Sequence, residues 1–320
     1  MKDWKLTQTK PLFDRIRKHP GVRVSQNPAV ILLLFAAALF CSVCAETVLG
    51  TVPQTVLMMK KKTPQDDPDI FLILGLMLTF VNILIPAIVC VFAEKRPLRT
   101  MGFTRKRCMP DYLTGLLLGF CMMSAVVMAA WKAGAIRLNG GFRQVPVLTA
   151  AVTAVGWGIQ GLSEEVTFRG YLMMSLGTRT KPWMSVAVSS LLFAFAHAFN
   201  DGFSLPAFVN LFLFGVTEAL LVLRTDSIWA AAALHSVWNW AQGSFYGLTV
   251  SGLMTASSFL VFEQTGSANW IGGKTFGLEA GAGTTAVCLL VSIILLSLIP
   301  QRAGSARLLD RKFSGDEVKK

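Results

Sequence analysis

The sequence contains few charged residues. Asp, Glu, Lys and Arg make up 15% of the 320 residues, whereas a soluble domain carries about 25%. Apolar residues reach 53%, the mean hydropathy is +0.55, and the apolar residues come in long runs. This composition excludes an ordinary soluble enzyme and predicts an all-α polytopic membrane protein.

Eight apolar ranges are long enough to be transmembrane helices. A bilayer core of about 30 Å takes about 20 helical residues to cross. The fourth range is too long for a straight crossing, so we expect it to bend near Gly161. The eight predicted spans are residues 29–49, 70–92, 112–131, 147–176, 183–199, 205–223, 228–245 and 283–300.

All the positive charges except Arg169 lie outside these ranges and not along one face, which argues against nucleic-acid binding despite a net charge of +12. With the N-terminus in the cytoplasm, 22 of the 30 Lys and Arg fall on the cytoplasmic side and 7 on the outer side. The positive-inside rule then predicts that both the N- and C-termini are cytoplasmic. We expect a basic leader (1–28), a membrane domain (29–300) and a basic tail (301–320), in a multi-pass protein of a bacterial plasma (inner) membrane.

Polar residues suited to chemistry gather in four of the predicted spans. An ionisable side chain inside a span costs about 2.5–3.5 kcal/mol on insertion scales and is a functional-site candidate by default. Two of the three histidines in the chain fall inside spans. The candidates are Glu164, Glu165 and Arg169 in the fourth span, His197 in the fifth, Glu218 in the sixth, and His235 with Asn239 in the seventh.

Spacing along the helices distinguishes residues with a structural role from candidate catalytic residues. Glu165 and Arg169 are four residues apart, so they share a helix face and can pair, and we interpret this pair as structural. Glu164 is rotated by about 100° from Glu165 and faces a different neighbour. Glu218, alone on its helix, is interpreted as a partner for a neighbouring His or as a buried neutral acid.

The remaining four residues form a set suited to activating water. At 1.5 Å per residue, Glu164, His197, His235 and Asn239 lie at depths of about 18, 21, 10 and 16 Å from the cytoplasmic ends of their spans. A carboxylate in an apolar cavity can act as a general base, and a neutral His can orient the water. The second His and the Asn can donate to an oxyanion. Taken singly, each His or Asn could instead only hydrogen-bond between helices, but the four together favour a catalytic site.

At these residues the chain resembles the CAAX amino-terminal protease and bacteriocin-processing proteins, also called the CPBP or Abi family. Glu164, Glu165 and Arg169 match the EExxxR motif of the family, Phe193 and His197 match FxxxH, and His235 and Asn239 match HxxxN. The resemblance covers about residues 95–300. It implies an eight-helix, glutamate-dependent intramembrane endopeptidase of the type that cleaves isoprenylated CAAX proteins in eukaryotes.

The resemblance also implies a role for each matched residue. Glu164 with His197 would activate water, and His235 with Asn239 would stabilise the oxyanion. Support for the site would come from Glu165, Arg169 and Phe193. We expect no cofactor and no metal. The alternative is zinc held by Glu164, His197 and His235, which their different depths disfavour because zinc ligands must lie close together.

The expected partners are membrane lipid and a peptide or membrane-protein substrate, and no nucleic acid. Bacterial members of the resembled family mostly have no prenylated substrates, so peptide pheromones, bacteriocin precursors and membrane-anchored regulators are all plausible. The alternative function is a non-catalytic immunity or scaffold protein that binds a peptide partner. The sequence leaves the oligomeric state open.

Overall fold

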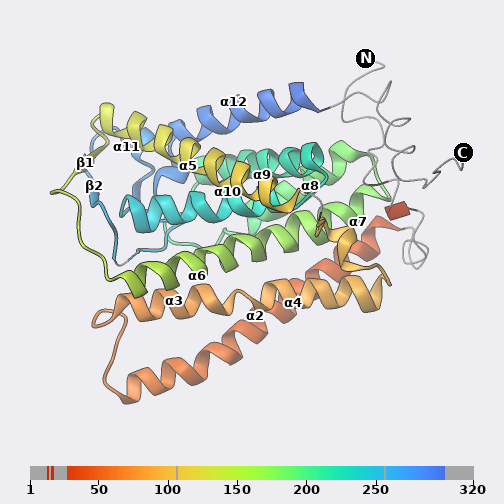
Figure 1. Cartoon of the computed structure of the whole chain (residues 1–320), viewed down its shortest axis with the longest axis horizontal. Coiled ribbons are helices and arrows are strands. Elements are labelled where there is room, and N and C mark those ends of the chain that lie inside the picture. The colour runs from red at the N-terminus through yellow and green to blue at the C-terminus, as the bar shows by residue number, and fades with distance from the viewer. Residues whose placement is uncertain (1–12, 14–15, 18–26, 106, 256, 300–320) are drawn as a thin grey trace, which may run out of the picture.

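The computed structural model describes residues 13, 16–17, 27–105, 107–255 and 257–299 (Figure 1). The predicted tail (301–320) and most of the predicted leader (1–28) lie outside the described residues. The chain is mostly helical, as the composition predicts. Its long helices run roughly along one axis as a layered bundle, with α2 crossing the bottom layer obliquely (Figure 1).

A helix lies at each of the eight predicted ranges. The second combines two helices and a π-helical turn (Val89–Ala93), and the seventh ends in a π-helical turn (Ala241–Phe245). The helices are α2 (Pro28–Met59), α3 (Pro68–Leu78), α4 (Val81–Ile88), α5 (Cys108–Lys132), α6 (Val147–Glu165), α7 (Met174–Gly177), α8 (Pro182–Ala196), α9 (Leu205–Thr225), α10 (Trp229–Trp240) and α12 (Ala282–Leu298).

Four of these stretches are long and apolar enough to cross a membrane by length and composition. They are α2, the combined stretch Pro68–Ala93, α5 and α9. Two further apolar helices, α8 and α12, are shorter. A membrane protein with several spanning helices is therefore supported, whereas the count of eight crossings and the orientation of the termini stay predictions.

Helix α10 occupies the centre of the bundle because small residues let its neighbours approach closely. Ala230 to Ala233 are all buried, and α10 packs against α5 and α6. A Cβ atom at Gly119 of α5 would lie 2.5 Å from the Leu234 carbonyl oxygen, so only glycine fits there. Small residues at helix contacts are typical of membrane bundles, because they let the backbones of neighbouring helices approach closely.

The fourth predicted span departs from α-helical geometry, but not where we expected. Helix α6 is regular through Glu165, and a π-helical turn (Val166–Met173) then leads into α7. The expected bend near Gly161 is therefore wrong. Gly161 instead provides a close helix contact, because a Cβ atom there would lie 2.6 Å from the Ser236 backbone nitrogen of α10. π-Helical turns often occur at functional sites.

One end of the bundle is covered by short irregular elements, which the all-α prediction did not include. Strands β1 (Ile136–Leu138) and β2 (Phe262–Gln264) pair antiparallel, and Arg137 forms an ion pair with Glu263 across them. Helix α11 (Asn269–Gly272) and two 3₁₀ turns (Lys274–Phe276 and Leu278–Ala280) follow before α12. These elements lie at the same end as the connection between α2 and α3 (Figure 1).

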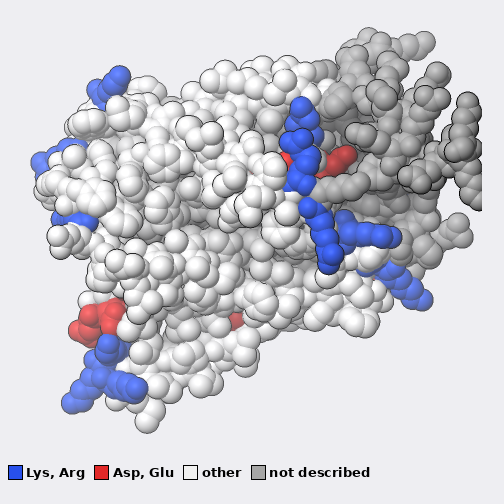
Figure 2. Space-filling model, viewed as in Figure 1, with Lys and Arg blue, Asp and Glu red and all other residues white. Residues whose placement is uncertain are grey.

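The opposite end is held by a buried network of charges. The Arg96 Nε and Arg179 Nη2 atoms lie 3.1 and 3.2 Å from Glu94 Oε2. Ser175 Oγ donates to Glu94 Oε1 and accepts from Arg96 Nη2. This network joins the chain after α4 to α7. Charged residues gather at the two ends of the molecule, with an almost uncharged band between them (Figure 2).

Reporter fusions test the predicted orientation. Fusions after Lys62 and after Lys274 should report the outer side, and fusions after Arg105 and Lys312 should report the cytoplasm, because the positive-inside count along the sequence assigns most Lys and Arg to the cytoplasmic side. A matched pair of reporters, one active only in the cytoplasm and one only outside, provides the control. A cytoplasmic signal at Lys274 contradicts the predicted number of crossings.

Candidate functional site

A cavity of about 780 Å³ lies inside the bundle, between α3, α6, α8 and α10. Its lining includes all four residues predicted to carry chemistry: Glu164, His197, His235 and Asn239. Glu164 lies on α6, His197 directly follows the last residue of α8, and His235 and Asn239 lie on α10. The structure thus brings the predicted residues together in one cavity.

The Glu164 carboxylate lies at the centre of the group. Its Oε2 atom is 3.6 Å from His235 Nε2 and 3.9 Å from His197 Nε2. Both imidazoles therefore reach the same oxygen. The predicted difference of about 11 Å in depth counts backbone rise alone, and it does not keep the two Nε2 atoms apart. The predicted depths therefore give no reason against one zinc ion shared by both histidines.

The second nitrogen of each histidine is held by a hydrogen bond. His197 Nδ1 donates to the Phe193 carbonyl oxygen at 2.9 Å, since a carbonyl can only accept. His235 Nδ1 donates to Glu165 Oε1, also at 2.9 Å. When neutral, each ring consequently presents the lone pair of its Nε2 atom toward Glu164. In the described part of the chain, Glu164 Oε2 itself has no hydrogen-bond partner.

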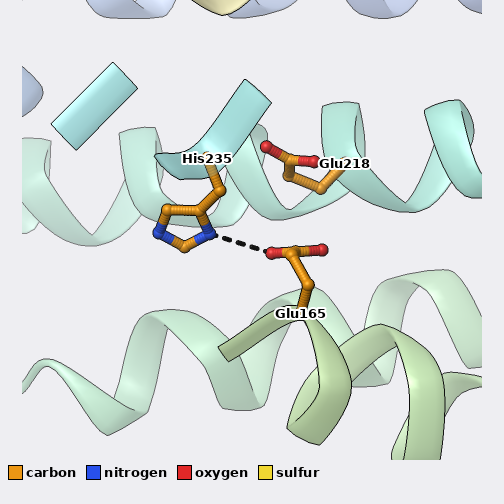
Figure 3. A group of neighbouring side chains, drawn as sticks. All are labelled: Glu165, Glu218 and His235. Atoms are coloured by element: carbon orange, nitrogen blue, oxygen red, sulfur yellow. Dashed lines mark hydrogen bonds and ion pairs between the residues drawn. The ribbon is translucent and has the colours of Figure 1, made fainter. Parts of the chain in front are cut away.

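Glu165 links the helix that carries it to the helix that carries His235. Its Oε1 atom accepts from Arg169 Nη1 at 2.9 Å, which agrees with the predicted i,i+4 pair, and from His235 Nδ1 (Figure 3). The Glu165 and Arg169 side chains are completely buried. The Arg169 guanidinium lies 4.4 Å from the Phe193 ring centre. The sequence indicated the Arg169 partner but not the histidine.

Gln160 is a site residue that the sequence analysis missed. Its Nε2 atom donates to Glu164 Oε1 at 2.6 Å, and its Oε1 atom accepts from Asn239 Nδ2 at 2.8 Å. Gln160 therefore fixes both side chains in the cavity. The signal was present, because Gln160 lies one helical turn before Glu164 on the same face.

Glu279 is a second missed residue. It lies in the second 3₁₀ turn before α12 (Leu278–Ala280) and lines the same cavity as Glu164. Burial raises the pKa of its carboxyl group, and the hydrogen bonds that Ser251 donates from its backbone nitrogen and Oγ act in the opposite direction. The sequence signal that could have indicated Glu279 is an acidic residue in a glycine-rich, mostly apolar loop.

Glu218 lies behind the site, on α9. One ligand atom each of Glu165, Glu218 and His235 lie within 4.8 Å of one another, and Figure 3 shows the Glu218 carboxyl group close to the other two. Neither Glu218 oxygen has a hydrogen-bond partner among the described residues. Glu218 thus lies near His235 without bonding to it, so the first interpretation, a partner for a neighbouring His, is not observed, and the second, a buried neutral acid, stays a prediction. This group of possible metal ligands differs from the zinc set predicted as the alternative.

Residues 144–241 match a family model described as type II CAAX prenyl endopeptidase, Rce1-like. The matched segment begins just before α6 and ends just after α10, so it contains all three motifs. The resemblance found in the sequence is therefore confirmed over this segment, which is narrower than the 95–300 we expected. A comparison with curated proteins gives no match.

Replacing Glu165 tests its structural role. The Glu165→Gln substitution should lower the free energy of unfolding by about 3–5 kcal/mol, because it leaves the Arg169 charge buried without a counter-charge. Thermal unfolding of the detergent-purified protein measures the change. Glu263→Gln, which breaks an exposed ion pair at the hairpin, is the matched control and should change the melting temperature little. Equal effects of the two substitutions contradict the structural role.

Proposed function

We propose that this chain, whose residues 144–241 match the Rce1-like type II CAAX prenyl endopeptidases, is an intramembrane endopeptidase that hydrolyses a peptide bond with water activated by Glu164. The observation that carries the proposal is the convergence of Glu164 Oε2 with the Nε2 atoms of His197 and His235 inside one cavity. Three acceptor atoms facing one another need a donor between them.

A water molecule fits this requirement. The separations of 3.6 and 3.9 Å exceed a direct hydrogen bond, and polar groups separated by more than about 3.5 Å can share a bridging water. We propose that the water donates one hydrogen to Glu164 and is oriented by His197 Nε2. Its oxygen attacks the carbonyl carbon while Glu164 takes the proton. When the carbon–nitrogen bond breaks, the Glu164 carboxyl group returns that proton to the leaving amine.

The oxyanion formed in this step would be stabilised by His235 and Asn239. Asn239 Nδ2 carries two hydrogens, of which Gln160 accepts one, so the other is available for the oxyanion. His235 can donate from Nε2 only as an imidazolium. The hydrogen bond from His235 Nδ1 to Glu165 holds the ring in place for that step, which gives Glu165 a supporting role in addition to its pairing with Arg169.

The substrate class we propose is a peptide or membrane-protein segment, with bacteriocin precursors among the candidates, in the plasma membrane of a bacterium. A protein that only binds such a segment needs a cavity but no base beside two imidazoles. The Glu164 group therefore favours an enzyme over an immunity or scaffold protein.

Replacing Glu164, the proposed base, distinguishes a peptidase from a protein that only binds a peptide. Glu164→Gln keeps the shape and should keep the fold, but it should lower peptidase activity at least about 100-fold, the usual contribution of a general base. Cleavage of membrane peptides by the purified variants is measured by mass spectrometry, with thermal unfolding as the control for folding. Normal activity of the variant contradicts the role of Glu164. Absence of activity in the unaltered protein favours the binding function.

Chelation tests the proposed metal-free mechanism. Zinc would use Glu164, His197 and His235, whose side chains are of the types that zinc binds. Because the proposed mechanism uses the Nε2 atoms for water and oxyanion, the protein should keep most of its activity after treatment with a strong chelator and dialysis. Elemental analysis provides the independent readout. Stoichiometric zinc, with activity lost on chelation and restored by zinc alone, would overturn the proposal.

A further inference from the structure

The cavity has exposed walls at one end of the bundle. Pro64, Gln65 and Pro68, from the connection between α2 and α3, line it and are exposed. So are Leu253 and Met254, from the chain between α10 and β2, and Met254 is 82% exposed. The Glu164 side chain, deeper in the cavity, is 23% exposed. We define the mouth as these five residues: Pro64, Gln65, Pro68, Leu253 and Met254.

The other end of the bundle is closed beneath the site. Every residue from Glu165 to Thr178 is buried, and none of them lines the cavity. Beyond them lies the buried network of Glu94, Arg96, Ser175 and Arg179. A peptide can therefore reach Glu164 past the mouth but not through this densely packed half.

The mouth lies on the side with less positive charge. It is at the end of the bundle that carries the β1–β2 hairpin, whereas the loops at 94–107 and 178–181 and the start of α2 lie at the other end (Figure 1). The positive-inside count from the sequence, which includes the predicted leader and tail outside the described residues, assigns 22 Lys and Arg to the predicted cytoplasmic side and 7 to the predicted outer side, where the loops at the mouth end fall. By this rule the mouth faces away from the cytoplasm.

The chemistry of the walls selects the kind of segment that can enter. Most of the lining is apolar, with Phe71, Leu72, Leu76, Trp157 and Phe214 forming much of it. No Lys or Arg lines the cavity within the described part of the chain, and its carboxyl groups are Glu164 and Glu279. A free carboxyl-terminal carboxylate would find no Lys or Arg partner among these residues and would lie near two carboxyl groups, and burying an unpaired charge is unfavourable.

We propose that the substrate is an apolar segment of an exported or membrane-anchored peptide, which enters from the outer side and is cut at an internal bond, and not the free carboxyl terminus of a cytoplasmic protein. This inference rests on the proposed function. The walls of the cavity come mainly from α3 and from the chain after residue 241, outside the segment that matches the Rce1-like model. The side from which a peptide enters and the part of the peptide that is cut are therefore inferred from residues of this chain that the family model does not cover.

Cysteine labelling tests the side without any need for activity. Cys41, Cys44, Cys108 and Cys121 are replaced by Ser, and the buried Cys90 and Cys288 are kept. Met254→Cys should then react with a membrane-impermeant maleimide in intact cells. The matched control, Lys181→Cys at the opposite end, should react only after the cells are made permeable. The reverse pattern overturns the outer-side entry.

Paired peptides test the substrate end. Two quenched fluorescent peptides share one apolar sequence, and one ends in an amide while the other ends in a free carboxylate next to the apolar stretch. The purified protein should cut the amide peptide at least as fast as the free acid, and Glu164→Gln should cut neither. A free acid that is cut more than tenfold faster, with release of its last few residues, overturns the substrate proposal and leaves the proposed peptidase function standing. If the unaltered protein cuts neither peptide, the result contradicts the peptidase function and with it the substrate class. The labelling result then still decides on which side of the membrane the mouth opens.

Discussion

The buried Glu165 carboxylate is the group on which the site depends. A charge with no access to water is tolerated only when it is paired and hydrogen-bonded, and Glu165 has both an arginine and a histidine as partners. The arginine comes from the next turn of the same helical stretch and the histidine from α10. One carboxylate therefore neutralises Arg169, sets the orientation of the His235 ring and joins two helices.

The position of Glu165 also determines where the Glu164 carboxylate lies. Glu164 precedes Glu165 by one residue, so it is turned by about 100° around the helix and faces the cavity when Glu165 faces the interior. Gln160 then holds the Glu164 oxygen that does not face the histidines. The two adjacent glutamates thus have different roles. Glu165 is completely buried and ion-paired, whereas Glu164 keeps one oxygen free of protein partners in the described chain.

The structure also separates the group that would act on the substrate from the walls that would select it. Residues on α6, α8 and α10 form the group, and they lie within the segment that matches a peptidase family. The walls near the mouth come from α3 and from the chain after α10. The Asp69 carboxylate at the start of α3 accepts hydrogen bonds from the backbone nitrogen and Oγ of Ser257, so the two walls are tied to each other. Such a division allows the walls to differ between related chains while the central group is retained.

Much of the architecture could be predicted from the sequence, because apolar ranges of about 20 residues form helices in order to satisfy their backbone hydrogen bonds away from water. The i,i+4 spacing likewise determined the pairing of Glu165 with Arg169. Only the tertiary structure decided that His235 bonds to Glu165, that Gln160 joins Glu164 to Asn239, and that His197 and His235 reach the same oxygen. These contacts depend on how side chains from different helices meet and on the close approach that Gly161 allows to Ser236, and hydropathy along one chain carries no information about either.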